Sequence, residues 1–310
     1  MCGKLRVNVD HYPVEPVLLY ISVNWTKQYC VCWLNIGHKC LFGAIAMNSE
    51  LVDISILEPR WVKIQDWLSR RDLGALLVYS PAAEHKWGQN GHVAYLTGWA
   101  NHDRIVESAV VVPLEGHPVL LFAGLSYMLE QIGDVSPVKD VRLVRAIDPN
   151  AVAVDSKTVG GIGPRSFAEE AKRVMHENNI FGKKVGIAGI ENMPVPFYEH
   201  LCDEFGENLV RGGDIVAKIR AVKTPDEIEL IKAAAHLGDI GFRKLVEISK
   251  PGMKGIEIVA EMEHAVRKEG ADHAKYWIAS GPATVWEDGK LDIRPHLRVL
   301  QDGDFINTCS

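Results

Sequence analysis

Residues 219 to 234 read Ile-Arg-Ala-Val-Lys-Thr-Pro-Asp-Glu-Ile-Glu-Leu-Ile-Lys-Ala-Ala. Four independent signals in this stretch indicate a helix start. Thr224 suits the cap position, and Pro225 suits the first helical position because its missing N–H would have no partner there. Asp226 and Glu227 place acids in the first turn, and Glu227 is spaced to close a capping box with Thr224. The stretch therefore predicts a long helix that begins at Pro225.

Downstream of this start, the chain predicts two helices and then strands. Pro251-Gly252 ends the first helix, and Gly270 ends the second. Strands are expected over Tyr276–Ala279 and Asp304–Cys309, so that the chain stops inside a strand whose backbone groups need further partners. The expected inward positions are Ile228, Ile231, Ala235, Phe242 and Val246 in the first helix, and Ile256, Val259, Met262 and Val266 in the second.

Upstream of residue 219, helical and strand patterns alternate, which is typical of an α/β domain. A helix is expected from Pro59 to a stop at Gly74, and Ala75–Tyr79 is a continuous apolar run of the kind found in a fully covered strand. Ser166-Phe-Ala-Glu169 is a capping box that predicts a helix to about His176. Further strands are expected over His92–Trp99, Ser108–Val112, Pro118–Phe122, Lys184–Ala188 and Asp214–Ile219, and a further helix over Pro194–Phe205.

These patterns divide the chain into residues 1–50, residues 51–214 as an α/β domain, and residues 215–310 as a partial α+β domain. Residues 1–50 mix Trp, Tyr and Cys without a helical or strand period. They are either an extra edge element or, as we prefer, a poorly ordered extension ahead of a natural start at Met47.

Composition narrows the class of partner. The chain has 310 residues, of which 47% are hydrophobic, and a formal net charge of -6. That balance argues against nucleic acid as the main partner and favours a small molecule or a peptide. The apolar stretch Val17–Trp25 is about half the length of a membrane span and lacks the features of a secretory signal. We therefore expect a cytoplasmic protein with reduced thiols and no membrane partner.

Several of these segments resemble motifs of the creatinase, prolidase and Xaa-Pro aminopeptidase family. The stretch from Ile219 to Ala234 is similar to the linker and first helix of the family's second domain, the pita-bread domain. The motifs that follow in family order are Pro251-Gly-Met253, Ser280-Gly281-Pro282 and Leu300-Gln-Asp-Gly-Asp304, and upstream Tyr95-Leu-Thr-Gly98 and Lys184-Val-Gly-Ile187 resemble its amino-terminal domain. The resemblance implies a creatinase-type α/β domain followed by part of a pita-bread domain.

The resemblance also implies chemistry. Metal-dependent relatives hold two divalent ions (Mn, Co or Zn) between two Asp, one His and two Glu, and use them to activate a water against an Xaa-Pro bond. Creatinase-type relatives lack the metals and hydrolyse a small C–N substrate with a His, and other relatives are lyases acting on small cationic substrates. The family also implies a homodimer.

This sequence departs from the metal-binding pattern. The family's first metal-binding Asp corresponds to Cys309, and a lone thiol is a poor ligand for hard cations, which prefer oxygen. The remaining Asp, His and both Glu of the family's set are expected after Ser310. We therefore expect no metal site in this chain and a catalytic centre that is incomplete as given.

Four residues remain as site candidates. His296 lies just upstream of the Gly303-Asp304 turn, where the family has a catalytic or substrate-gating His, and an unperturbed imidazole can act as a base near neutral pH. A solvated loop His is the alternative. His102 and Arg104 follow the Tyr95 to Gly98 motif and suit a carboxylate-bearing substrate, or form an exposed polar loop. Trp286 could line a pocket for a prolyl or cationic ring, or be buried in the core.

The sequence thus predicts an Xaa-Pro-peptidase- or creatinase-like hydrolase of amide or amidino C–N bonds. Two rival hypotheses stay open. One is a non-catalytic binding or oligomerisation module of the same fold, which the Cys309 substitution favours, and the other is a lyase-type member of the family.

Overall fold

The structure is a computed structural model that describes residues 19–22, 53–80, 91–99, 107–124, 128–145, 165–213, 215–271, 274–282 and 291–309. Backbone contacts divide the chain into two compact units. We call residues 49–228 the large unit, and residues 229–310 together with residues 1–48 the small unit. None of the described helices is both long enough and apolar enough to cross a bilayer.

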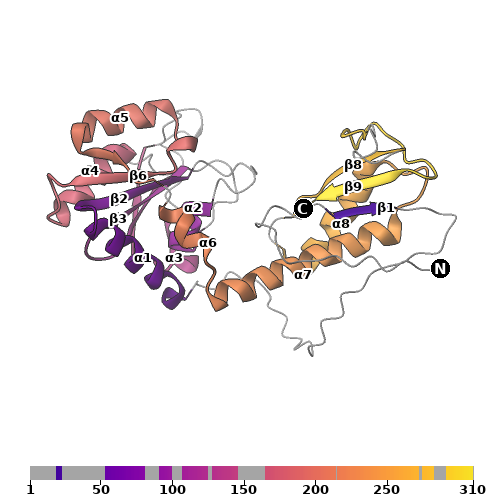
Figure 1. The fold of residues 1–310 in the computed structure, drawn as a ribbon, viewed down its shortest axis with the longest axis horizontal. Coiled ribbons are helices and arrows are strands. Elements are labelled where there is room, and N and C mark those ends of the chain that lie inside the picture. Colours follow the sequence, from indigo (N-terminus) through magenta and orange to yellow (C-terminus); the bar gives the residue numbers. More distant parts are fainter. Residues whose placement is uncertain are drawn as a thin grey trace. The chain divides into compact units, whose positions relative to one another are not determined.

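A six-stranded sheet forms the centre of the large unit (Figure 1). Its strand order is β5-β4-β3-β2-β6-β7. β3 pairs antiparallel with β2 and with β4, and β3 and β4 confirm the strands predicted over Ser108–Val112 and Pro118–Phe122. The pairs β4–β5, β2–β6 and β6–β7 are parallel. The strands are β2 (Leu73–Ser80), β3 (Glu107–Pro113), β4 (Val119–Ala123), β5 (Asp140–Leu143), β6 (Lys184–Ala188) and β7 (Leu209–Arg211).

Helices cover both faces of this sheet. On one face, α1 (Ile54–Ser69), α2 (Gly91–Thr97), α3 (Met128–Val135) and α6 (Ile215–Ala221) share an apolar cluster with alternate strand residues such as Leu76 and Val78. On the other face, α4 (Phe167–Glu177) and α5 (Val195–Phe205) pack on the intervening residues, among them Leu77 and Tyr79. All eight residues of β2 are buried, so the continuous apolar run correctly predicted a strand covered on both faces.

The strand predicted over His92–Trp99 is wrong, because the structure has helix α2 there. Val93 and Leu96 are both fully buried, and this spacing of three residues is helical. The Thr97 hydroxyl donates to the Val93 carbonyl oxygen at 2.8 Å, which stabilises the last turn. Gly98 then adopts a positive φ of 73° and ends the helix. A short apolar segment does not distinguish the two periods by itself.

The strand predicted over Asp214–Ile219 is also wrong, because α6 begins at Ile215. Ile215, Val216 and Ile219 are buried together against the cluster that α1 and α2 share, and positions i, i+1 and i+4 lie on one helical face. α6 therefore packs as part of the large unit.

Helix starts were predicted with mixed success. Ser166 and Glu169 form the expected capping box at the start of α4. α1, by contrast, begins at Ile54, where the side chain of Asp53 accepts a hydrogen bond from the Ser55 N–H at 2.9 Å, so Pro59 lies inside the helix. The predicted stop at Gly74 is wrong as well, because Gly74 lies within β2.

The predicted helix start at Pro225 is confirmed, and Glu227 has two roles there. Its carboxylate accepts a hydrogen bond from the Thr224 N–H at 2.7 Å, and the Thr224 hydroxyl accepts one from the Glu227 N–H at 3.2 Å. The same carboxylate accepts a hydrogen bond from Arg60 of α1 at 2.8 Å. Arg60 also donates to the Tyr95 carbonyl oxygen at 2.5 Å and lies 3.9 Å from the centre of the Tyr95 ring. The first turn of α7 (Pro225–Ile248) is thus tied to α1 and α2.

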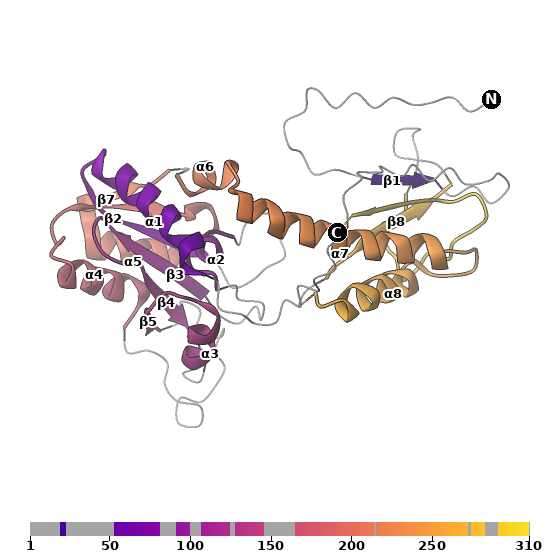
Figure 2. The same ribbon diagram turned by 90° about the horizontal axis from the view of Figure 1, so that it is seen from below.

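The small unit has a three-stranded antiparallel sheet with strand order β1-β9-β8. Its strands are β1 (Leu19–Ser22), β8 (Trp277–Gly281) and β9 (Phe305–Cys309), and α8 (Gly255–Lys268) lies beside α7 on one side of them (Figure 2). β1 lies at the edge of this sheet, where the alternative of an extra edge element would place part of residues 1–50, and the preferred extension ahead of Met47 stays a prediction. The rest of residues 1–50 lies outside the described residues.

The core of the small unit is built from α7, α8 and one face of the sheet. The inward stripe of α7 contains Leu245, which is buried, with Leu237, Ile240 and Ile248 packed around it. A Cβ at Gly241 would overlap the Tyr276 hydroxyl, so the glycine allows that ring to lie against the helix. Several predicted inward positions are wrong, because their side chains are 42 to 51% exposed: Ile228, Ile231, Val246 and, in α8, Ile256.

We expect Glu227→Ala to destabilise the large unit by about 3 kcal/mol or more, because it leaves the buried Arg60 guanidinium without its counter-charge and removes the helix cap. Asp226→Ala is the matched control. Asp226 is exposed in the same turn, so its loss should cost about 1 kcal/mol or less. Urea dependence of hydrogen exchange at the β2 amides measures both effects, and equal losses in the two variants would contradict the prediction.

Candidate functional site

The segment before β9 is held against β8 and the start of α8. Asp292 exchanges two backbone hydrogen bonds with Ser280 of β8, at 2.8 and 3.2 Å. The Ile256 N–H donates to the Pro295 carbonyl oxygen at 3.0 Å, and the Leu300 N–H donates to the Met253 carbonyl oxygen at 2.8 Å. These bonds place the motifs Pro251-Gly-Met253 and Leu300–Asp304 side by side in the fold.

Asp304 closes the turn that leads into β9. Its buried carboxylate accepts a hydrogen bond from Arg298 at 2.6 Å and another from the Gln301 N–H at 2.8 Å. Gly303 has a positive φ of 83°, which favours glycine at that place in the turn. The Gly303-Asp304 pair therefore sets the path by which the chain enters β9.

His296 lies exposed in this segment, between Arg294 and Arg298. Arg294 pairs with Asp292 at 3.0 Å and Arg298 pairs with Asp304, and no hydrogen bond or ion pair to His296 is found in the part of the chain that the structure describes. The catalytic role of His296 stays a prediction. The other candidates, His102, Arg104 and Trp286, lie outside the described residues.

β9 presents different chemistry on its two faces. Ile306 packs with α7 and α8 in the core, and the Thr308 hydroxyl on the same face donates to the Trp277 carbonyl oxygen at 2.8 Å. Phe305, Asn307 and Cys309 alternate with them and lie on the opposite face. Burial raises the pKa of the Cys309 thiol, which keeps it protonated at neutral pH.

The described residues do not fit the pair of divalent ions that the family implies. Cys309 stands on β9 at the position where the family pattern has a carboxylate, and a thiol is a poor ligand for hard cations; its neighbour on the same face, Asn307, is a carboxamide. Between residues 19 and 309, the described segments contain no group of three or more His, Cys, Asp or Glu side chains placed to hold a metal. We therefore assign no metal chemistry to these residues.

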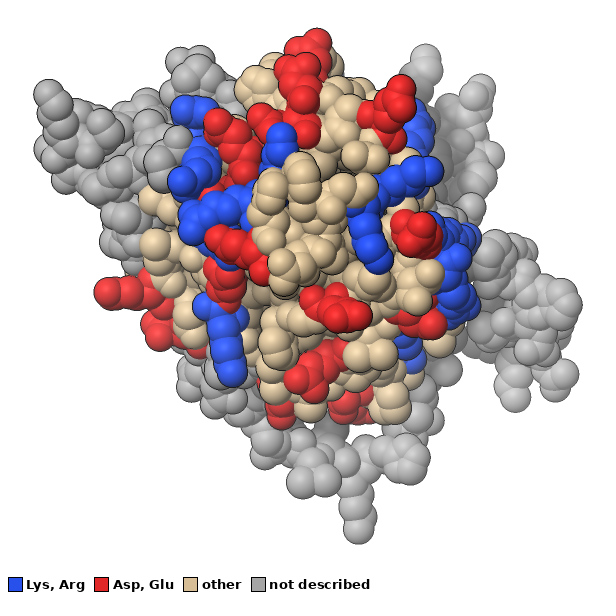
Figure 3. All heavy atoms as spheres, turned by 90° about the vertical axis from the view of Figure 1, so that its left-hand side faces the viewer, with Lys and Arg blue, Asp and Glu red and all other residues tan. Residues whose placement is uncertain are grey.

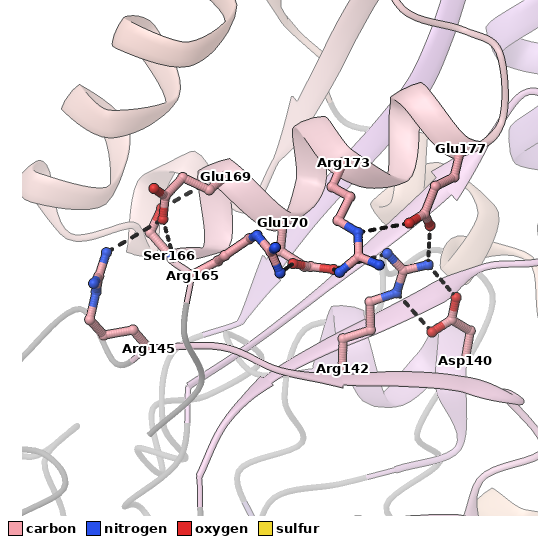
Figure 4. Close-up of polar contacts among 9 residues, drawn as sticks. All are labelled: Asp140, Arg142, Arg145, Arg165, Ser166, Glu169, Glu170, Arg173 and Glu177. Carbon is pink, nitrogen blue, oxygen red and sulfur yellow. Dashed lines mark hydrogen bonds and ion pairs between the residues drawn. The ribbon is translucent and has the colours of Figure 1, made fainter. Parts of the chain in front are cut away.

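A second polar cluster, which sequence reasoning missed, lies at the edge of the large unit's sheet (Figure 4). Arg142 of β5 donates to Asp140, Glu170 and Glu177 at 2.6 to 2.9 Å. Arg173 donates to Glu177 at 2.8 Å and lies 3.5 Å from Glu170. The spacing of Glu170, Arg173 and Glu177 along one face of α4 was the available signal.

This cluster borders a hollow of about 500 Å³ and is balanced in charge. Arg142, Arg165 and Arg173 all approach Glu170, which is buried, so three cations surround one carboxylate. The network ties α4 to the edge strand β5, and charged side chains on an edge strand oppose pairing with another chain. On the face of the large unit drawn in Figure 3, basic and acidic residues are likewise interspersed, without a field of one sign.

His92 and Arg220 connect α2 with α6. Arg220 lies 3.1 Å from Nδ1 of His92, which can accept its hydrogen bond only when that nitrogen carries no proton. The pKa of His92 is lowered by burial and by the charge of Arg220, while Glu191 acts in the opposite direction. Burial also raises the pKa of the neighbouring Tyr95 to about 12. The fold therefore keeps both side chains neutral at physiological pH.

Known proteins share this architecture. The Xaa-Pro dipeptidase from Bacillus anthracis superposes with a TM-score of 0.56 at 18% identity, over 80% of this chain and 59% of that chain. The X-Pro aminopeptidase from Thermotoga maritima MSB8 gives a TM-score of 0.56 at 21% identity over the same shares. The two units thus define an α/β protein with the fold of the prolidases and Xaa-Pro aminopeptidases.

Sequence comparison is more specific. Residues 60–222 match the creatinase/prolidase N-terminal domain. The uncharacterized peptidase YqhT of Bacillus subtilis (strain 168) is 35% identical over 100 residues, which is 32% of this chain and 27% of that protein. The chain belongs to the creatinase/prolidase family, as its motifs predicted. Its matched segment spans about a quarter of the length of the curated relatives.

We expect the large unit to lose stability as the pH falls below 6.5, the ordinary pKa of His92. The folded state depresses this pKa, so the unfolded chain takes up the proton first, and stability that is complete above pH 6.5 declines toward the lower folded pKa. Urea midpoints at pH 7.5 and pH 5 measure the change.

His92→Gln should flatten this pH dependence, because glutamine does not titrate. His200→Gln, at an exposed position of α5 in the same unit, is the control and should leave it unchanged. A wild-type slope in the His92→Gln variant would show that the decline comes from other groups.

Proposed function

We propose that this protein is an Xaa-Pro-peptidase-like hydrolase that cleaves a C–N bond in a small amide, an amidino compound or an Xaa-Pro peptide. The observation that carries the proposal is the order of the two parts. A creatinase/prolidase N-terminal domain over residues 60–222 is followed directly by the helix pair and sheet seen in solved prolidases. The matched relatives include proteins described as peptidases and a putative dipeptidase.

We propose further that the 310 residues do not turn over such substrates alone. The chain spans 59% of the Xaa-Pro dipeptidase that it superposes on. Within the segments that the structure describes, His296 stands exposed, and the β9 face carries a neutral amide and a neutral thiol. Activity would then require the residues that relatives supply in the remainder of their length, together with a divalent ion if the intact enzyme uses one.

A homodimer in the cytoplasm is part of the same proposal. The family resemblance supports the dimer, and the composition supports the compartment. Light scattering of the purified chain tests the oligomeric state.

A non-catalytic binding module is the second candidate. The specific observation that favours it is Cys309, because the position of a family carboxylate holds a thiol whose pKa is raised. A binding module would keep the fold and lack turnover even when the chain is extended to the full length of its relatives.

Incubation of the purified chain with Gly-Pro, with glycylglycine and with creatine, each with and without Mn²⁺, tests the proposal. We expect no product from the 310-residue chain and turnover from a chimera that carries the remaining part of a prolidase. A chimera with Cys309→Asp is the companion, because a carboxylate restores an oxygen ligand for hard cations. Turnover by the 310 residues alone would refute the claim of incompleteness, and two inactive, folded chimeras would favour the binding module.

A further inference from the structure

Asn307 is a buried polar residue whose acceptor the fold leaves unused. Its side chain lies in the small unit with 8% of the residue exposed, and its Oδ1 has no hydrogen-bond partner. Two other buried side-chain atoms share this property within the described residues, the Nε atoms of Arg60 and Arg298. Each of those guanidinium groups bonds a carboxylate through another nitrogen. Asn307 is thus the one described residue with a buried, unpartnered acceptor oxygen.

The position of Asn307 is central. It lies in the middle of β9, the inner strand of its sheet, opposite Ala279 of β8. Its side chain is on the face away from the core that α7 and α8 form, between the half-buried Phe305 and Cys309. The neighbours across the strand pair are small, since Ala279 and Gly281 lie on the same face. Trp277, 43% exposed, stands across from Cys309 on that face.

A buried acceptor without a donor makes folding less favourable. A buried carbonyl oxygen without a donor loses its bonds to water and gains none in the protein. A leucine of similar size would fill the same space without that loss. A buried polar group without a partner requires an explanation, and a loss of stability in favour of function is one that natural proteins use.

We propose that Asn307 is a specificity-determining residue that accepts a hydrogen bond from an amide N–H of the substrate. The inference rests on the proposed function, which supplies an amide-bearing substrate class. Among the described residues, the neighbours of Asn307 on this face carry no charge: they are the rings of Phe305 and Trp277, the thiol of Cys309, and Ala279 and Gly281, and they suit a neutral amide. The nitrogen of an Xaa-Pro bond carries no N–H, so the acceptor favours secondary amides over Xaa-Pro bonds.

Two dipeptides that differ by one methyl group test this preference on the whole 310-residue chain. Glycylglycine has an amide N–H, and glycylsarcosine carries a methyl group on the same nitrogen. Calorimetric titration measures affinity, and the ¹⁵N–¹H signals of the Asn307 side chain report on the contact. We expect glycylglycine to bind about tenfold more tightly, the difference that one hydrogen bond makes. Asn307→Leu should reduce that ratio to about one by weakening glycylglycine.

Two controls separate binding from structure. Asp302→Asn changes an exposed residue of the turn before β9, leaves the face that carries Asn307 as it is, and should keep the preference for glycylglycine. Without ligand, Asn307→Leu should melt at the wild-type temperature or above it, because no internal hydrogen bond is lost.

Several results would overturn the inference. These are equal affinities of the wild type for the two dipeptides, no binding of either, loss of the preference in Asp302→Asn, or a lower melting temperature of Asn307→Leu. None of these measurements requires that the chain hydrolyse a dipeptide. If the preference holds while no chimera hydrolyses an amide, the proposed hydrolase fails and the role of Asn307 in binding stands.

Discussion

The arrangement of α1, α2 and the first turn of α7 depends on the buried contact between Arg60 and Glu227. Their side chains are about one-tenth exposed, and the carboxylate that bonds Arg60 also caps α7. A charge removed from water needs a partner with good geometry, so this pair permits few alternative arrangements of α1, α2 and the first turn of α7. The stacked Tyr95 ring and the Arg220–His92 contact extend the same cluster. The motif that identifies the family is therefore also the point where four helices meet.

The ion pairs at the edge of the large unit's sheet have a different role from the buried Arg60–Glu227 pair. Around Arg142, several ion pairs join α4 to an edge strand and leave a hollow of about 500 Å³ without a net charge. These groups compensate one another, which accounts for order at the sheet edge and leaves no strong field for an ionic ligand. The β9 face of the small unit is the opposite case, because it carries no described ion pair and one unsatisfied acceptor. Of the two surfaces, the β9 face is the better suited to neutral ligands.

Site prediction was limited by what a linear sequence can show. The motifs that resemble the family drew attention to β9 and to the segment before it, and the structure places both against β8. Counting along the motif drew attention to Cys309, whereas Asn307, two residues earlier, carries no motif and was overlooked. What distinguishes Asn307 is that its Oδ1 has no hydrogen-bond partner. This can be judged only when the positions of all neighbouring atoms are known. The Arg142 network was overlooked for a related reason, since its members come from a strand and a helix that meet only in the fold.

The sequence by itself determined the features that rest on local chemistry. Capping boxes at Ser166 and Thr224 were correctly predicted because their hydrogen bonds join residues three positions apart. The continuous run in β2 was predicted because two covered faces require apolar residues at every position. Tertiary structure decided the identity of α2 and α6 and the inward stripe of α7. A short or broadly apolar segment has several faces that could be buried. The elements packed against it decide which face is buried.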